Sequence, residues 1–129
     1  MKKFTQAEFD ALPRDANGYK ICPTGDYSGI SFFPECCKFG AESKFGASFY
    51  FGGIKFQRLY MMQNLDGSGR QIICLFGDSD PHINAGCFFG TVDEFCRKAQ
   101  SENKMFYASV VKAACDAYAA TLNQYKGEL

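Results

Sequence analysis

The hydrophobic positions between residues 31 and 56 recur every six residues. Phe33, Phe39, Phe45 and Phe51 share one phase of this repeat. A large apolar residue at every sixth position is typical of a hexapeptide β-solenoid, in which each hexad forms one flat side of a coil with its phenylalanine pointing inward. Four hexads make little more than one coil, so we expect the segment to pack against the rest of the chain. Ordinary strands joined by evenly spaced glycine-rich turns are the alternative.

A glycine follows three of these phenylalanines, at Gly40, Gly46 and Gly52. Glycine tolerates backbone angles that are costly for residues with a Cβ. We therefore expect these three glycines at the corners of the coil, where the chain changes direction.

The first residues carry the polar signature of a helix start. Thr5 and Glu8 stand three residues apart, as in a capping box, and an apolar residue lies on either side of the pair. Pro13 cannot continue a helix. The pattern predicts a short helix over residues 6–11.

Two helices are predicted at the C-terminal end. Thr91 with Glu94 forms a second capping box and predicts a helix over residues 92–100. The last helix is expected to begin at Ser101 or Asn103 and to end at Gly127. Its apolar face is expected to cover the sheet, and the residues at helical spacing on that face are Phe106, Val110, Ala114, Tyr118, Leu122 and Tyr125.

The segments between the repeat and these helices have the pattern of strands. Apolar runs over 56–63 and 71–76 flank a turn that contains Asp66 and Gly67, which is a strong hairpin signal. A further strand is expected over 83–89, and a short one over 19–22.

This order of elements predicts an α+β protein with a single domain. We expect a small β region, with about one solenoid-like coil and a hairpin, packed against two C-terminal helices. The expected segments are an N-terminal helix and loop (1–30), the hexad repeat (31–56), the hairpin and strand (57–90) and the C-terminal helices (91–125).

Composition excludes several functional classes. The chain has 129 residues, with 47% hydrophobic and 22% charged residues and a formal net charge of zero. Such a balance argues against a protein that binds nucleic acid through bulk positive charge. No apolar run is long enough to span a bilayer, and the first residues lack the apolar core of a signal peptide. We therefore expect a cytoplasmic protein without a membrane partner.

Seven cysteines are many for a chain of this length, and an odd number cannot pair completely within one chain. Without an export signal we expect reduced thiols that fill core positions. No Cys-x₂-Cys pair announces a zinc site. The alternative hypothesis is a metal- or thiol-dependent protein in which Cys36, Cys37, Cys87 and His82 come together.

Nothing in the sequence forms a recognisable catalytic set. His82 is the only histidine, and it follows a loop that contains Asp80 and Pro81. A general base needs a nucleophile within reach, and the candidate thiols are separated from His82 in the sequence, so that only the fold can bring one close to it. We interpret His82 as a solvated turn residue and expect a non-enzymatic protein without a cofactor.

Several segments resemble a group of short, uncharacterised proteins that carry tandem Ser-Phe-Gly-Glu-x-Cys hexads. The resemblance rests on MKKFTQAEFDALP at the start, CPTGDYS at 22–28, the Phe-Gly hexads and GCFFGTVDEF at 86–95. It covers most of the chain up to about residue 96. This sequence has few hexads, and cysteine is mostly replaced at their small position. The group is associated with gut Firmicutes and their phages and mobile elements, which implies such a setting here but no activity.

The leading hypothesis is therefore a small protein–protein interaction module. A protein of this size from a phage or mobile element could block a host machine, and inhibition of a defence complex such as CRISPR–Cas is the concrete version. The expected binding residues lie on the flat or edge-strand face of the repeat and just after it, and they are Lys44, Tyr50, Lys55 and Arg58. The same basic residues, with Lys38, suggest single-stranded nucleic acid as a weaker alternative. Self-association through a sheet edge is another.

Overall fold

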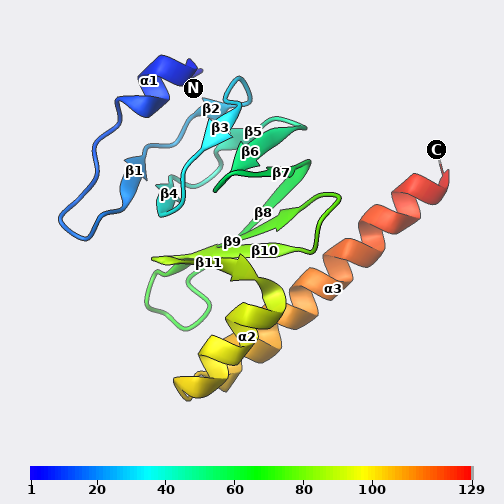
Figure 1. Ribbon diagram of the computed structural model, residues 1–129. Helices are drawn as coiled ribbons and strands as arrows, with labels where there is room; N and C mark the ends of the chain where they lie inside the picture. The colour runs from blue at the N-terminus through cyan, green and yellow to red at the C-terminus, as the bar shows by residue number, and fades with distance from the viewer. Residues whose placement is uncertain (129) are drawn as a thin grey trace.

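The computed structural model describes residues 1–128 and arranges them in three layers (Figure 1). An N-terminal layer, residues 1–56, packs on one face of a four-stranded central sheet, and two helices cover the other face. The α+β class is confirmed, with one short N-terminal helix, several small sheets and two C-terminal helices.

The N-terminal layer contains one helix and seven short strands. The helix is α1 (Gln6–Asp10), and its capping box between Thr5 and Glu8 is present as predicted. The strands are β1 (Lys20–Cys22), β2 (Asp26–Tyr27), β3 (Phe32–Phe33), β4 (Cys37–Phe39), β5 (Lys44–Phe45), β6 (Phe49–Phe51) and β7 (Ile54–Phe56).

Six of these strands form three parallel pairs, β1 with β4, β2 with β5 and β3 with β6. The paired residues are 17 or 18 positions apart, as are the side-chain contacts from Thr24 to Ala41 and from Ser43 to Gly25. This separation matches three hexads. Of the four phenylalanines in the hexad phase, Phe45 is half-buried and the other three are buried.

The glycines of the repeat serve a different purpose from the one expected. Gly52 has the positive φ of a turn, at 57°, but Gly40 and Gly46 do not. A Cβ on Gly46 would lie 2.7 Å from the carbonyl oxygen of Ser28, and one on Gly40 would overlap the backbone of Thr24. The prediction of corner angles is therefore wrong at two of the three positions. Glycine is needed there because the paired segments approach closely.

The central sheet is antiparallel, in the order β11-β10-β9-β8. Its strands are β8 (Arg58–Gln63), β9 (Gln71–Phe76), β10 (His82–Ala85) and β11 (Phe88–Thr91). The hairpin of β8 and β9 is confirmed. The single strand expected over 83–89 is wrong, because Gly86 adopts a positive φ of 60° and reverses the chain, so that β10 and β11 pair with each other.

Strand β9 is buried along its whole length because it is covered on both faces. Ile72, Cys74 and Phe76 face the helices, whereas Ile73 and Leu75 face the N-terminal layer. A continuous apolar run is what a strand covered on both faces requires. The two layers therefore share one strand as their common support.

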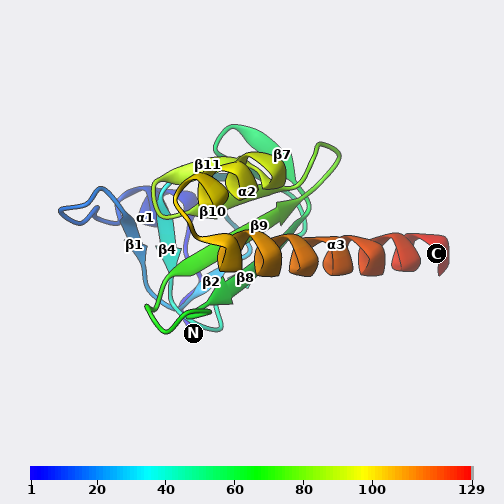
Figure 2. The same ribbon diagram turned by 90° about the horizontal axis from the view of Figure 1, so that it is seen from below.

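The C-terminal helices are α2 (Val92–Ser101) and α3 (Met105–Glu128). The capping box of Thr91 and Glu94 is present, as predicted. Helix α3 begins later than expected and runs through Gly127 instead of ending there. Its C-terminal part projects beyond the sheet (Figure 2).

The apolar face predicted for α3 is correct only in its second half. Phe106 is 50% exposed, whereas the buried positions at the start of the helix are Tyr107, Ala108 and Val111. The helix is rotated in this way because small residues allow α2 and α3 to approach, with the Cys96 thiol 3.6 Å from the carbonyl oxygen of Ala108. Further along, Ala114, Tyr118 and Leu122 pack against the core as expected, and Tyr125 lies outside the side chains that the structure describes.

Candidate functional site

The structure brings together two of the four predicted binding residues. Tyr50 on β6 is the register partner of Lys55 on β7, and both side chains are exposed. Lys44 lies on β5, in a different sheet, and Arg58 lies on β8 of the central sheet. Lys44 and Arg58 are also exposed, but no strand pairing joins them to Tyr50 and Lys55.

A third residue, missed by the sequence analysis, completes a row across the sheet of β3, β6 and β7. Phe32 is the register partner of Tyr50, so Phe32, Tyr50 and Lys55 lie side by side. We call these three residues the aromatic row. The two rings stack with their centroids 5.4 Å apart and their planes 15° from parallel. Phe32 is 60% exposed and Tyr50 is 40% exposed.

The backbone under the row is fixed by a side chain from α1. The amide oxygen of Gln6 accepts hydrogen bonds from the backbone N–H groups of Ser31, at 3.0 Å, and Phe32, at 3.2 Å. The amide nitrogen of Gln6 donates to the carbonyl oxygen of Phe32, at 2.9 Å, and to the carboxylate of Asp10. Gln6 thus occupies the hydrogen-bonding edge of β3, where another strand would otherwise pair.

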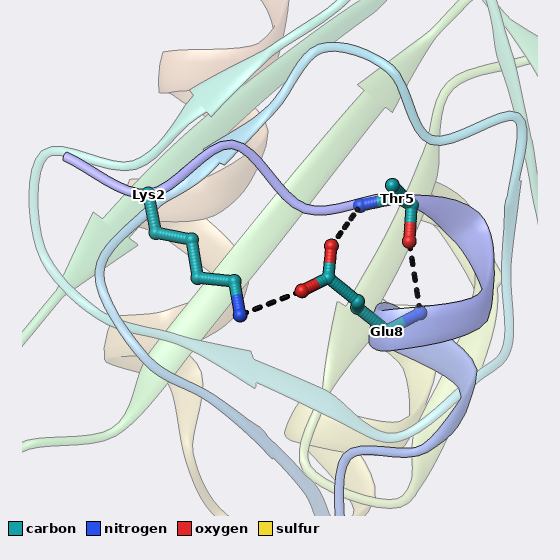
Figure 3. Close-up of polar contacts among 3 residues, drawn as sticks. All are labelled: Lys2, Thr5 and Glu8. Atoms are coloured by element: carbon teal, nitrogen blue, oxygen red, sulfur yellow. Dashed lines mark hydrogen bonds and ion pairs between the residues drawn. The ribbon is translucent and has the colours of Figure 1, made fainter.

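Helix α1 is in turn held by polar contacts at its first turn (Figure 3). The Glu8 N–H donates to the Thr5 hydroxyl oxygen, and the Thr5 N–H donates to the Glu8 carboxylate, each at 3.1 Å. The Lys2 ammonium lies 2.7 Å from the same carboxylate. The contact with Lys2, followed by those with Thr5, lowers the pKa of Glu8 from its ordinary 4.5 to about 2.

A buried lysine closes the other end of α1. The Lys20 ammonium donates to the carbonyl oxygens of Phe9 and Asp10, both at 3.1 Å, and of Leu12, at 2.9 Å. The last carbonyl groups of a helix have no partner within the helix itself. Lys20 therefore binds two of these carbonyl groups, and that of Leu12 just beyond the helix, from β1 and holds α1 against the strands.

The four residues of the alternative metal or thiol site are not brought together. The Cys36 and Cys87 thiols are neighbours, but Cys37 points into the core, with its thiol 3.1 Å from the carbonyl oxygen of Pro34. His82 packs against Phe56 and Phe89, with Nδ1 2.7 Å from the carbonyl oxygen of Asp80. Within residues 1–128, no three potential ligands among His, Cys, Asp and Glu are grouped to hold a metal ion.

No described helix is long and apolar enough to cross a membrane. Comparison of the chain with protein-family models, with curated proteins and with solved structures finds no match. The aromatic row and its surroundings are therefore the features of the molecule that indicate a function.

Proposed function

We propose that the protein is a small non-enzymatic interaction module that binds another protein through the aromatic row. The observation that carries this proposal is the stacked pair of Phe32 and Tyr50 on the outer face of the sheet. A single exposed apolar residue is ordinary, but two adjacent exposed rings held in register form a ready contact surface.

The row has the composition of an interface centre. Tyrosine is enriched among the residues that dominate protein–protein binding, because its ring buries a large area with few rotatable bonds. Phe32 and Tyr50 also limit each other's motion by stacking, which lowers the entropy cost of binding. Within the described chain Lys55 forms no ion pair, so its ammonium is available to a partner. The fitting partner is a protein with an apolar recess and a carboxylate at its rim.

We further propose the setting that the sequence resemblance implies, a phage or mobile element with a host defence complex as the target. The three parallel strand pairs support the proposal that the repeat forms a solenoid-like scaffold for the row, because their separation matches three hexads. The rigid cover of α1 over this scaffold would allow a short chain to present a fixed surface.

The test is capture of partners from bacterial lysates by the tagged protein, with two matched variants. The double variant Phe32→Ser/Tyr50→Ser removes both rings from the row. Ile21→Ser removes a 42% exposed apolar side chain from β1, in a different sheet, and serves as the control. We expect one stoichiometric protein partner that the control retains and the double variant loses. Loss of a dominant contact of about 2 kcal/mol or more corresponds to roughly a 30-fold weaker complex.

Several outcomes would contradict the proposal. The double variant, shown to be folded by circular dichroism, could retain the partner, which would assign binding to another surface. Captured nucleic acid that is released by moderate salt would favour the nucleic-acid alternative. Light scattering could show a molecular mass that rises with protein concentration. If the double variant abolished this rise, the row would bind a second copy of the chain.

A further inference from the structure

Six of the seven cysteines lie beside another cysteine, although all seven are reduced. The pairs are Cys22 with Cys37, Cys74 with Cys115, and Cys36 with Cys87. The first two pairs are buried in the two cores, and the sulfur atoms of the second are 3.5 Å apart. Only the third reaches the surface, where Cys87 is exposed and Cys36 is partly exposed.

The surface pair is held by contacts between two layers of the fold. Cys36 lies between β3 and β4, and its N–H donates to the side-chain oxygen of Asn84, at 3.1 Å. Cys87 lies in the turn between β10 and β11, three residues after Asn84 in the same hairpin. The Cys87 thiol is 3.7 Å from the hydroxyl of Tyr19. Lys20, which follows Tyr19 in the chain, donates its N–H to the carbonyl oxygen of Cys36, at 2.9 Å. Both cysteines therefore contact the same two-residue segment, Tyr19 and Lys20.

We propose that Cys36 and Cys87 form a reversible disulfide, a redox site that joins the N-terminal layer to the central sheet. The oxidant is a hydroperoxide. The Cys87 thiolate attacks the peroxide oxygen, the O–O bond breaks, and a sulfenic acid and one water are formed with hydrogen peroxide. The Cys36 thiol then attacks the Cys87 sulfur and displaces a second water. Two thiols lose two electrons and two protons to the peroxide, and a dithiol reductant reverses the reaction.

Exposure determines the order of these steps. Cys87 is the more accessible thiol and meets the oxidant first. Cys36 is partly covered, and this burial, together with the neighbouring Cys87 thiol, raises its pKa. Cys36 is thus a poor first target for peroxide but lies next to the sulfur that has been oxidised. The backbone of Cys36 has a positive φ of 61°, an uncommon conformation for a residue other than glycine.

The cross-link would have a mechanical consequence. Cys36 belongs to the loop that leads into β4, and Cys87 belongs to the turn that joins β10 to β11. Joining them closes a loop that contains most of the β strands and restricts the unfolded chain. Oxidation should therefore raise the stability of the contact between the N-terminal layer and the sheet without a change of fold.

The experiment treats the folded, fully reduced protein with a small excess of hydrogen peroxide. We expect an intact mass lower by two hydrogens, five thiols that remain open to alkylation after unfolding, and a higher denaturant midpoint. The Cys36→Ser and Cys87→Ser variants should lose the cross-link. Cys37→Ala and Cys96→Ala should keep it, because Cys37 pairs with a different thiol and Cys96 is buried without a pair among the described residues.

The proposal fails if peroxide joins either buried pair in the folded protein, or if Cys87 proceeds to a sulfinic acid while Cys36 stays free. It also fails if the product is a disulfide between two chains. Partner capture by the oxidised and the reduced protein is a separate measurement. Loss of the partner from the aromatic-row variants would not affect the mass result, so the two proposals can fail independently.

Discussion

The N-terminal layer and the helical layer rest on the same strand, β9, but are built from different side chains. Eight of the thirteen buried residues in the core under the N-terminal layer are aromatic, against three of fourteen in the core under the helices. Helices satisfy their backbone hydrogen bonds internally, so small aliphatic residues are enough to pack them. Strands of two or three residues cannot do so, and large interlocking rings supply the contact area that their short ladders lack.

The two layers also differ in how their backbone edges are covered. Helices α2 and α3 require little beyond the capping box of Thr91 and Glu94. In the N-terminal layer, amide side chains form the backbone hydrogen bonds that a neighbouring strand would otherwise form. Buried Gln71 accepts from the Phe39 N–H and donates to the Phe39 carbonyl oxygen, at 2.9 and 2.8 Å. Buried Asn84 covers Cys36 and Cys37 in the same way.

The largest loss of folding stability should come from removing one core side chain from each layer. Phe51 is fully buried in the aromatic core, and Ile72 is fully buried in the core under the helices. Phe51→Ala should lower the free energy of unfolding by about 3–5 kcal/mol, and Ile72→Ala by about 2–5 kcal/mol. Urea unfolding is followed by far-ultraviolet circular dichroism for the helices and by hydrogen exchange of the β1–β7 amides for the N-terminal layer.

Because both cores include residues of β9, we expect both signals to shift together in each variant. If Phe51→Ala moved only the hydrogen-exchange signal of β1–β7, the N-terminal layer would unfold by itself and the shared strand would not couple the two layers. Phe32→Ala is the control, because its ring is 60% exposed and its loss should change stability by less than about 0.5 kcal/mol.

A smaller effect should come from the side chains that cover strand edges. Gln71→Met keeps the approximate volume but leaves the buried N–H and carbonyl of Phe39 without partners. We expect a loss of about 1–3 kcal/mol, measured by the same urea titration. Gln63→Met is the matched control, since Gln63 is the register partner of Gln71 but is exposed. Equal effects of the two substitutions would show that the buried amide hydrogen bonds do not stabilise the N-terminal layer.

The smallest effect should be on the stability of the folded protein at low pH. Glu8 and Glu94 occupy the same position in two capping boxes, and both have a lowered pKa, but Glu8 also contacts Lys2. A lowered pKa stabilises the folded state above the ordinary value of 4.5, and this contribution is lost as the pH falls from there towards about 2. We expect Glu8→Gln to flatten the acid side of the stability profile.

Glu94→Gln should flatten the acid side of the stability profile less, because the pKa of Glu94 is lowered mainly by its hydrogen bonds with Thr91. Thermal unfolding at a series of pH values between 2 and 7 measures both variants. The comparison is wrong if Glu94→Gln has the larger effect. Addition of salt should reduce the difference, because both carboxylates are at the surface.

Local patterns in the sequence predicted most of the elements. The two capping boxes, the hairpin of β8 and β9 and the inward phase of Phe33, Phe39 and Phe51 depend on residues close in the chain, so their signals are visible without a structure. The prediction for the rotation of α3 is wrong, because that rotation depends on contacts between residues on different helices, such as Cys96 with Ala108.

The candidate site was only half predictable for the same reason. Tyr50 and Lys55 lie in one hairpin, and the sequence analysis named both. Phe32 was missed, although it precedes the inward-pointing Phe33 and must therefore face outward in a strand. Its position beside Tyr50 depends on the pairing of β3 with β6, eighteen residues away. The roles of Gln6 and Asn84 could not be seen at all, because an amide side chain that replaces a strand has no local pattern.

The chemical reactivity of the buried Lys20 ammonium can report how often α1 detaches from the rest of the molecule. Lys20 is 6% exposed, and all three of its ammonium hydrogens are used by carbonyl oxygens at the end of α1. An acylating reagent can modify this amine only when α1 has moved away, whereas exposed lysines such as Lys44 and Lys55 react at once. The rate at which the Lys20 peptide gains the label, relative to the Lys44 peptide, would therefore report how often α1 detaches from the folded molecule.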